Sequence, residues 1–438
     1  MALLPYLLTT LLTLLPLTLA APQPPAALIL PRASPPALPL HSSSRWILDA
    51  NNARFKLRCT NWAGHMETHI PEGLQHASVD AIAAWIADQN FNCVRLTYSI
   101  DHALNPNLLV SDAFAAAAGA SGAPAGDMAA LYGRVLANND AWMTGNTTTR
   151  DVFARVVDAL YARGVVTILD NHVSRASWCC DLTDGNGWWD EAFGYNTWNS
   201  RFFKTQEWLA GLKAMAAWAR DGRPGVVGMS LRNEIREFLL QDLNGRADWY
   251  KYVKMAGDLV HATHPDVLVI VGGVQSTTDL LHLRSSNRGG GKMLDTSGWA
   301  GKHVWEMHAY SFTVTFPDAF HNCDIVKTQY GAFVGFVLEQ NKAYTGPLIL
   351  SEFGVGMQGG EFDGLSDKDN RYLSCLVSYM ENNDADWAVW AVQGSYYVRG
   401  GQVDYDESWG LMNHDWTGWR NPAFPGKLGN MWKMTQQP

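Results

Sequence analysis

The stretch VVGMSLRNE, residues 226–234, decides the fold. It begins as an apolar, strand-like run and ends on Asn233 and Glu234, an amide and a carboxylate side by side. A carboxylate at the end of a buried element is costly unless a partner binds it or a reaction uses it. A second run, LILSEFG at 348–354, has the same character and reaches Glu352 after its apolar residues. Both runs predict buried strands that present a carboxylate at the carboxyl end.

Short β-branched runs of this kind alternate with amphipathic helical stretches from residue 45 onward. Strands are predicted at 54–62, 92–99, 165–172, 226–234, 267–273, 302–310, 347–354 and 386–392. Helices, with apolar residues three or four apart, are predicted at 79–89, 150–163, 205–219, 247–261, 330–341 and 367–382. This alternation indicates an α/β fold, either a closed (β/α)8 TIM barrel or an open doubly wound sheet.

The spacing of the units favours the closed (β/α)8 barrel. A typical barrel has about 31 residues per strand-helix unit before insertions. Glu234 and Glu352 are 118 residues apart and enclose three such units, which fits a barrel with inserted loops. The long segments 104–149 and 173–203 follow strands two and three, on the face where barrel active sites are built. We predict one barrel domain over residues 45–438 with long loops after these two strands.

The amino-terminal residues indicate targeting rather than fold. A long apolar run that ends in small residues predicts a secretory signal peptide at 1–21. A signal anchor is the alternative, although Pro5 and Pro16 interrupt a span barely long enough for a bilayer. Residues 22–44 are Pro-rich without a regular period, which predicts a flexible leader. With the glycosylation sequon at Asn146, we expect a secreted, extracellular glycoprotein without stable membrane association.

The composition excludes some partners and favours another. The formal net charge is -9, and no Lys/Arg cluster is interleaved with aromatic residues, so we expect no nucleic-acid partner. The 47% hydrophobic content is enough for a large core. The chain has 19 tryptophans, whose flat indole faces are suited to stacking on sugar rings. We expect a monomer that binds carbohydrate.

Six cysteines permit disulfides in an oxidising compartment, and their pairing stays open. Cys59 and Cys93 lie in apolar, strand-like runs, which is typical of free core thiols. Cys179 and Cys180 are adjacent in a Trp- and Gly-rich loop, and we expect at least one of them to form a disulfide. No pair of cysteines has the spacing of metal ligands.

Glu234 and Glu352, at matched strand ends of one barrel mouth, predict the chemistry of a retaining glycosidase. In that chemistry two carboxyl groups about 5–5.5 Å apart flank the glycosidic bond; one protonates the leaving oxygen and the other attacks the anomeric carbon. An Arg beside the attacking carboxylate keeps it ionised, and a Tyr hydroxyl orients it. The alternative is that each Glu only caps the next helix or pairs with an Arg.

Other predicted strand ends carry further polar and aromatic side chains. Together with the two carboxylates they form an ordered set: Arg95, His172, Asn233, Glu234, His308, Tyr310, Glu352 and Trp390. Over roughly residues 45–435, this set resembles the active-site signature of glycoside hydrolase family 5, the cellulase-like barrels of a large retaining clan.

The resemblance implies a role for each of these side chains. Glu234 would be the acid/base, Glu352 the nucleophile, and Asn233 a partner for the sugar 2-hydroxyl. Arg95 and Tyr310 would support Glu352. The remaining three would form the cleavage subsite, as two lining imidazoles and a stacking platform: His172, His308 and Trp390.

The loops carry a narrower resemblance and further candidates. DNHVSRASWCCDLTDGNGWWD at 170–190, with GMSLRNEIRE, resembles a subgroup of that family from plants and fungi whose substrates are poorly defined. Trp178, Trp188 and Trp189 are candidate sugar platforms, with packing of the loop as the alternative. In NWAGHME at 61–67, His65 or Glu67 is a candidate substrate contact.

Two motifs suggest bound groups and are rejected. Gly354, Gly356 and Gly359 form a G-x-G-x-x-G after a strand, but a polar, turn-like segment follows instead of a helix. HMETH at 65–69 places two His four residues apart, but it is not H-E-x-x-H and lacks an evident third ligand. We therefore expect no cofactor and no metal.

The sequence thus predicts a secreted retaining glycoside hydrolase that cleaves β-glycosidic bonds of a polysaccharide or oligosaccharide by double displacement, in the manner of an endo-β-glucanase. An exo-β-glycosidase or diglycosidase of the same fold is one alternative. A metal-dependent barrel hydrolase would need a cluster of His and Asp at strand ends, and its H-x-H pair is absent. A non-catalytic carbohydrate-binding barrel is an alternative of another class.

Overall fold

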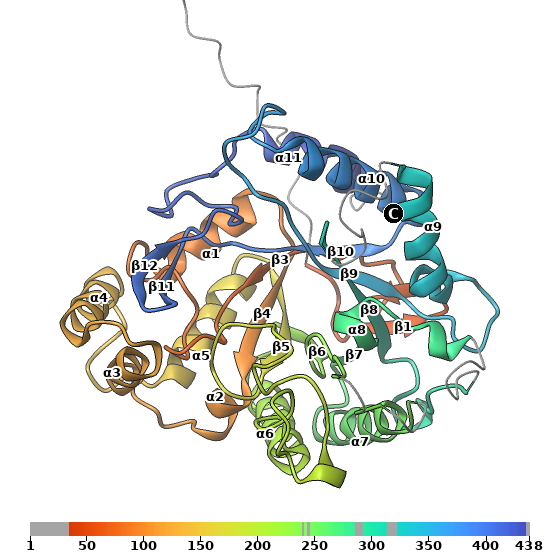
Figure 1. Cartoon of the computed structure of the whole chain (residues 1–438), viewed down its shortest axis with the longest axis horizontal. Helices are drawn as coiled ribbons and strands as arrows, with labels where there is room; N and C mark the ends of the chain where they lie inside the picture. The colour runs from red at the N-terminus through yellow and green to blue at the C-terminus, as the bar shows by residue number, and fades with distance from the viewer. Residues whose placement is uncertain (1–34, 239–240, 243–245, 285–291, 313–321, 435–438) are drawn as a thin grey trace, which may run out of the picture. The chain divides into compact units, whose positions relative to one another are not determined.

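Eight parallel strands close into a barrel at the centre of the molecule, which confirms the predicted TIM-barrel class (Figure 1). The computed structural model describes residues 35–238, 241–242, 246–284, 292–312 and 322–434. The barrel strands are β3 (Arg58–Trp62), β4 (Cys93–Ser99), β5 (Val166–Val173), β6 (Val226–Ser230), β7 (Leu268–Gly272), β8 (His303–Ala309), β9 (Leu348–Phe353) and β10 (Asp386–Val389). They pair in chain order, and β10 closes the ring on β3.

Helices follow the strands and cover the outside of the barrel (Figure 1). The longer ones are α1 (Val79–Asp88), α5 (Thr149–Tyr161), α6 (Thr205–Arg220), α7 (Ala247–Thr263), α9 (Cys323–Phe333) and α10 (Asp367–Asn383). Short helices are α2 (Ile100–Leu104), α8 (Val274–Thr277), α11 (Phe424–Lys427) and α12 (Gly429–Met434). Side-chain caps fix several starts; Thr148 and Asp151 form a capping box before α5. The helix predicted at 330–341 instead begins at Cys323 and gives way to a 3-10 turn, Gly335–Leu338.

Alternating strand residues build two layers of core. Inward-facing side chains fill one end of the barrel, among them Leu57, Val166, Ile168, Ile270 and Ile349. Outward-facing ones pack against the helices in a much larger cluster. The alternation follows from the two-residue period of a strand. In the part of the chain that the structure describes, no helix has the length and hydropathy needed to cross a bilayer.

The insertions differ from the loops expected at the sequence level. The segment 104–149 contains two helices, α3 (Val110–Ser121) and α4 (Ala125–Asn138). After β10 the chain forms a hairpin that was not predicted, β11 (Ser395–Arg399) and β12 (Gln402–Asp406). This hairpin contacts α3 and α4, and the four elements lie together in Figure 1.

The packed part of the chain begins ahead of residue 45. Strands β1 (His41–Ser43) and β2 (Trp46–Leu48) form a hairpin, and Leu40 is fully buried among the side chains that fill the barrel end. The predicted signal peptide at 1–21 and the leader up to residue 34 lie outside the described residues.

All six cysteines are paired, so the expectation of free thiols at Cys59 and Cys93 is wrong. These two residues occupy opposed positions on neighbouring strands β3 and β4, with Cα atoms 4.3 Å apart. Their apolar surroundings fit a buried disulfide as well as they fit buried thiols. The other disulfides are Cys179–Cys180, as the loop suggested, and Cys323–Cys375, which joins α9 to α10.

One irregularity in the barrel bears on the site. The pairing of β8 with β9 shifts register between Met307 and His308. Beyond this bulge, His308 stands opposite Glu352.

Candidate active site

The two carboxylates predicted from matched strand ends meet at the carboxyl end of the barrel. Glu352 is the penultimate residue of β9, and Glu234 follows the end of β6 by four residues. An oxygen of one carboxylate lies within 4.8 Å of an oxygen of the other. Glu234 has a left-handed backbone, with φ of 44°, a conformation that costs energy in a non-glycine residue and is typical of functional sites.

Barrel hydrogen bonds continue past β6 and fix the backbone that carries Glu234. The Leu231 N–H donates to Ile270 O at 3.1 Å, and the Asn233 N–H donates to Asn171 O at 2.9 Å. The chain therefore leaves the sheet at Asn233, with adjacent strands still holding it.

The guanidinium of Arg95, fully buried on β4, connects the polar groups of the barrel mouth. Its Nη1 donates to Glu352 Oε1 at 2.7 Å and to Asn61 Oδ1 at 3.0 Å. Its Nη2 donates to Asp170 Oδ1 and to Asn233 Oδ1, both at 2.8 Å. Burying a guanidinium costs least when its donors find acceptors, and these four acceptors bind both of its terminal nitrogens. Asp170, which lies on β5 and was not among the predicted site residues, is thus part of the site.

Tyr310 and His308 complete the contacts of the carboxylates. The Tyr310 hydroxyl donates to Glu352 Oε2 at 3.1 Å. His308 Nδ1 lies 3.0 Å from Glu234 Oε1 and 3.6 Å from Glu352 Oε2. Burial lowers the pKa of His308, which favours a neutral imidazole. Because Arg95 and Tyr310 occupy both oxygens of Glu352, that carboxylate is a poor candidate for a metal ligand.

The surroundings of the two carboxyls differ in a way that separates their protonation. Burial raises the pKa of Glu234 to about 7. Burial also raises the pKa of Glu352, but His308 and Arg95 oppose the rise. The guanidinium contacts Glu352 directly and does not contact Glu234. Arg236 and Arg95 also oppose the rise at Glu234, but the direct contact of the guanidinium with Glu352 favours Glu234 as the carboxyl that holds a proton near neutral pH.

His172 and Trp390 form a stacked pair beside the carboxylates. Their ring centroids are 5.4 Å apart with an interplanar angle of 19°. His172 Nδ1 lies 2.6 Å from Asp170 Oδ2, which orients the imidazole. Both rings line the cavity.

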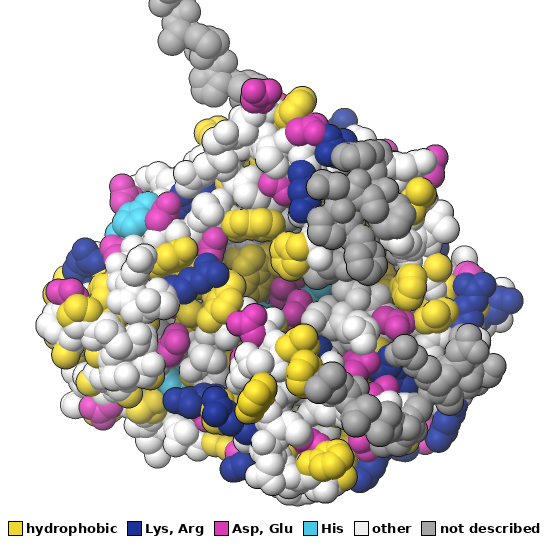
Figure 2. Space-filling model, in the orientation of Figure 1, with side chains coloured by type: hydrophobic (Ala, Val, Ile, Leu, Met, Phe, Trp, Pro, Cys, Tyr) yellow, Lys and Arg dark blue, Asp and Glu magenta, His cyan; other side chains and the backbone are white. Residues whose placement is uncertain are grey.

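A cavity of about 390 Å³ opens above these groups. Figure 2 shows the surface hollowed over the centre of the barrel, with hydrophobic and acidic side chains around the hollow. Six of the eight residues of the predicted set line the cavity: His172, Asn233, Glu234, Tyr310, Glu352 and Trp390. Arg95 lies beneath them and His308 between the carboxylates.

Of the three loop tryptophans predicted as sugar platforms, one lines the cavity and two are buried in the core. Trp178 lines the cavity, with the Arg399 guanidinium 3.5 Å above its ring. Trp188 and Trp189 are fully buried in the core between strands and helices, so a sugar platform at either position is wrong. The Trp189 ring contacts those of Phe203, Trp208 and Tyr252, and the Trp188 ring contacts that of Trp189.

The two candidates from the segment after β3 lie outside the lining of the cavity. His65 is buried behind His172, with ring centroids 4.0 Å apart, and its Nδ1 is 2.7 Å from Thr97 Oγ1. Neither His65 nor Glu67 is among the residues that line the cavity.

Sequence analysis missed one wall of the cavity. The β11–β12 hairpin and the residues after it supply Arg399, Tyr405, Glu407 and Trp409, and Phe312 adds an exposed ring stacked on Tyr310. The signal was present: SYYVR and QVDYD flank Gly400-Gly401, a pattern typical of a tight hairpin. Glu306 was missed as well; it is fully buried and accepts from Ser230 Oγ at 2.7 Å.

The chain is similar in sequence to proteins of a known family. The family model described as cellulase (glycosyl hydrolase family 5) matches residues 48–395. A glycosyl hydrolase 5 family protein of Chamaecyparis obtusa is 36% identical over 423 residues, covering 94% of this chain and 69% of the relative. An endoglucanase of Paenibacillus polymyxa is 20% identical over 406 residues, 87% of this chain and 84% of the relative.

A solved structure has the same fold. An endocellulase of Pyrococcus horikoshii, in complex with cellotetraose, superposes with a TM-score of 0.67 at 16% identity, over 92% of this chain and 100% of that chain. The chain belongs to glycosyl hydrolase family 5, the cellulase family, and is an O-glycosyl hydrolase.

Proposed function

We propose that the chain cleaves β-glycosidic bonds of a glucan with retention of anomeric configuration, in the manner of an endo-β-glucanase. The observation that supports retention is the approach of the Glu234 and Glu352 oxygens to within 4.8 Å. Retaining glycosidases place their carboxyls about 5–5.5 Å apart, whereas inverting ones need about 6.5–9.5 Å to admit a water. The short separation favours direct attack by one of the two groups.

In the first step Glu352 attacks the anomeric carbon and Glu234 protonates the departing oxygen. The contacts of Glu352 with Arg95 and Tyr310 hold it as an oriented carboxylate. Glu234 carries the proton at neutral pH because burial raises its pKa to about 7. The products of this step are a glycosyl ester on Glu352 and a free alcohol.

In the second step Glu234 acts as the base. Ester formation consumes the negative charge of Glu352, and loss of a neighbouring anion lowers the pKa of Glu234. The ionised Glu234 then takes a proton from water, which attacks the anomeric carbon and releases the sugar. The second inversion restores the starting configuration.

Endo-cleavage of a β-glucan is the first choice of substrate and mode. The Pyrococcus horikoshii endocellulase is described in complex with cellotetraose, and the Paenibacillus polymyxa relative is described as an endoglucanase. Trp178, Trp390 and Trp409 line the cavity of this chain, and indole faces suit stacking on glucose rings.

One observation favours a second candidate, exo-cleavage or release of a disaccharide. The cavity of about 390 Å³ is near the small end of the range for ligand pockets, about 300–1,000 Å³. The β11–β12 hairpin forms one of its walls. A cavity of this size suits a short saccharide better than the middle of a long chain.

The deciding experiment is hydrolysis of a panel of β-glucans, mannans, galactans and aryl β-glycosides, with product sizes and the first anomer recorded by NMR. Mixed oligomers at early times support endo-cleavage, and one small product supports exo-cleavage. A first product of inverted configuration contradicts double displacement.

Glu352→Gln is expected to lower kcat by on the order of 10⁴- to 10⁶-fold with the fold intact. Turnover near the wild-type rate in this variant would contradict the assignment of Glu352 as the nucleophile. Absence of turnover in the wild type would favour the carbohydrate-binding alternative.

We also propose that the protein is secreted as a monomeric glycoprotein. The apolar amino-terminal run supports secretion. The Asn146 side chain is exposed just ahead of α5, which makes the sequon accessible. Recovery of the protein from a eukaryotic culture medium tests secretion. Its intact mass before and after removal of N-glycans tests glycosylation, and light scattering tests the monomeric state.

A further inference from the structure

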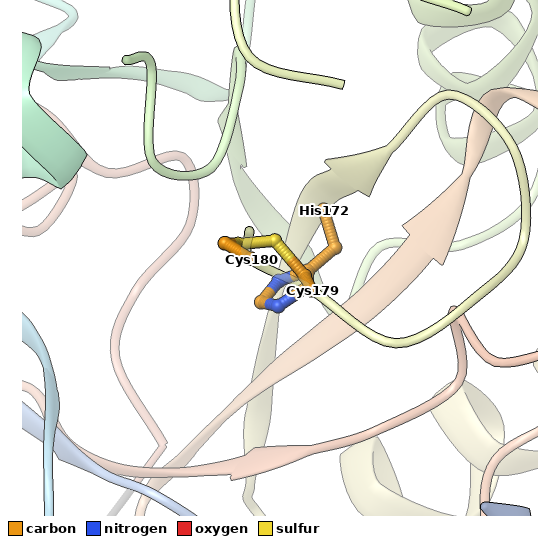
Figure 3. Close-up of side chains that lie close together, drawn as sticks. All are labelled: His172, Cys179 and Cys180. Atoms are coloured by element: carbon orange, nitrogen blue, oxygen red, sulfur yellow. A yellow bond between two sulfur atoms is a disulfide. The ribbon is translucent and has the colours of Figure 1, made fainter. Parts of the chain in front are cut away.

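The adjacent cysteines Cys179 and Cys180 occupy a place that the catalytic scheme does not use. They lie in the segment after β5 and are bonded to each other; Figure 3 shows this disulfide beside the imidazole of His172. Both residues line the same cavity as Glu234 and Glu352. Of the three disulfides in the described part of the chain, this is the one that lines the cavity.

The sulfurs contact the amide that precedes Glu234. Asn233 Nδ2 lies 3.8 Å from Cys179 Sγ and 3.5 Å from Cys180 Sγ. The oxygen of the same amide accepts from Arg95 at 2.8 Å. The amide is therefore held on both sides, with a guanidinium at its oxygen and weak sulfur acceptors at its nitrogen. This arrangement fixes which end of the Asn233 amide faces each neighbour.

The disulfide also gives the cavity a surface unlike its other walls. Cys180 is partly exposed to the cavity, whereas Cys179 is largely buried. Sulfur is polarizable and apolar, and a disulfide has no hydrogen-bond donor. Such a surface suits the C–H face of a sugar ring, while the Asn233 amide next to it offers a polar contact.

We propose that the Cys179–Cys180 disulfide is a substrate-binding and positioning element, which contacts a sugar ring and holds the Asn233 amide toward it. This inference rests on the proposed function. Loss of the disulfide weakens saccharide binding more than it slows the bond-breaking step, because the contacts of Glu352 with Arg95 and Tyr310 do not involve the sulfurs.

The test compares two double variants. Cys179→Ala/Cys180→Ala removes the disulfide of the cavity, and Cys323→Ala/Cys375→Ala removes the disulfide between α9 and α10 as a matched control. With the panel substrate that the wild type cleaves fastest, we expect the first variant to raise KM about tenfold and to change kcat less than about threefold. The control variant should keep both constants. An unchanged KM in the first variant, or an equal rise in both, overturns the proposal.

Reduction of the folded protein decides the matter should the first variant fail to fold. A dithiol gives two electrons and two protons to Cys179–Cys180, forms two thiols and becomes a cyclic disulfide itself. In the Cys323→Ala/Cys375→Ala protein, with the state of the sulfurs verified by mass spectrometry, KM should rise as above and return on reoxidation. A KM that stays constant after verified reduction overturns the proposal. A wild type that cleaves none of the panel contradicts the proposed function alone. The inference is then tested by calorimetry, which measures the Kd for cellotetraose in the same proteins. A higher Kd after loss of the Cys179–Cys180 disulfide supports the inference, and an unchanged Kd or an absence of binding overturns it.

Discussion

At the scale of single residues, Glu234 and Glu352 carry the same functional group and differ through their neighbours. Arg95 and Tyr310 contact Glu352, and burial raises the pKa of Glu234 to about 7. The proposed division into a proton donor and an attacking carboxylate thus depends on a few contacts around two chemically identical side chains.

The pH dependence of turnover follows from this division. The proposed first step needs protonated Glu234, so kcat/KM should fall as the pH rises through about 7. In Glu234→Gln this basic limb should vanish, and turnover of substrates with poor leaving groups should fall by about 10²- to 10⁴-fold. Aryl glycosides with very acidic phenols need no proton, so the burst of phenol from the first step should persist in the variant. A basic limb that survives in Glu234→Gln would assign the proton to another group.

Arg95 offers a second test at this scale. Lys keeps the charge but cannot make four directed hydrogen bonds, so Arg95→Lys should misplace Glu352 and lower kcat by roughly 10²-fold. Weaker pairing should raise the pKa of Glu352, which shifts the acid limb of kcat/KM to higher pH.

The matched control for this change is Arg150→Lys. Arg150 is another buried arginine, and its Nη2 donates to the backbone oxygens of His102 and Ala103. It does not line the cavity. The control should lose stability and keep its pH profile; an equal shift in both variants would mean that the effect is one of folding.

At the scale of elements, the β11–β12 hairpin adds one wall to the cavity at the mouth of the barrel. Its anchor is Asp404 on β12. The Asp404 carboxylate accepts from Gln75, Ser395 and Arg134, and it lies 2.8 Å from His76 Nε2. Hydrogen bonds, with that of His76 first, hold the pKa of Asp404 below its usual range despite the opposing effect of burial.

Removing this anchor should affect both binding and stability. Asp404→Ala should lower the free energy of unfolding by about 1–3 kcal/mol and raise KM, because Arg399 and Tyr405 on the same hairpin line the cavity. Asp406→Ala, on the same strand, removes a partly exposed ion pair with Arg420 and should cost less than about 1 kcal/mol. Denaturant titration and steady-state kinetics on both variants measure this. Equal KM values would remove the hairpin from substrate binding.

At the scale of the whole molecule, the buried carboxyl of Glu234 lowers stability once the pH is high enough to ionise it. Its pKa is about 7 in the folded chain against an ordinary value of 4.5, so the folded state binds more protons between these two pH values. The free energy of unfolding should therefore fall as the pH rises through this window.

Glu234→Gln removes this titration. The variant should be more stable than the wild type by about 1–3 kcal/mol at pH 8 and similar to it at pH 4. Thermal unfolding at both pH values provides the measurement. A constant difference between the proteins at the two pH values would contradict the raised pKa.

The features of fold and site that could be predicted from the sequence all depend on one local pattern. Barrel strands are apolar runs with a polar end, so the runs to Glu234 and Glu352 revealed both fold and site. The orientation of Trp188 and the opposed positions of Cys59 and Cys93 depend on how distant segments pack, which a local pattern does not contain. The hairpin was missed for another reason: its Gly-Gly turn follows the eighth strand, where a barrel is already complete.

The register shift between Met307 and His308 has a consequence for tolerance to insertion and deletion. Side chains of a strand alternate between lumen and exterior, so losing one residue ahead of Glu352 would turn its carboxylate outward into the layer of helices. At positions other than Glu352, strand β9 should therefore tolerate a change of side chain far better than a change of length. In such a barrel, insertions and deletions should be confined to the segments that connect strands to helices.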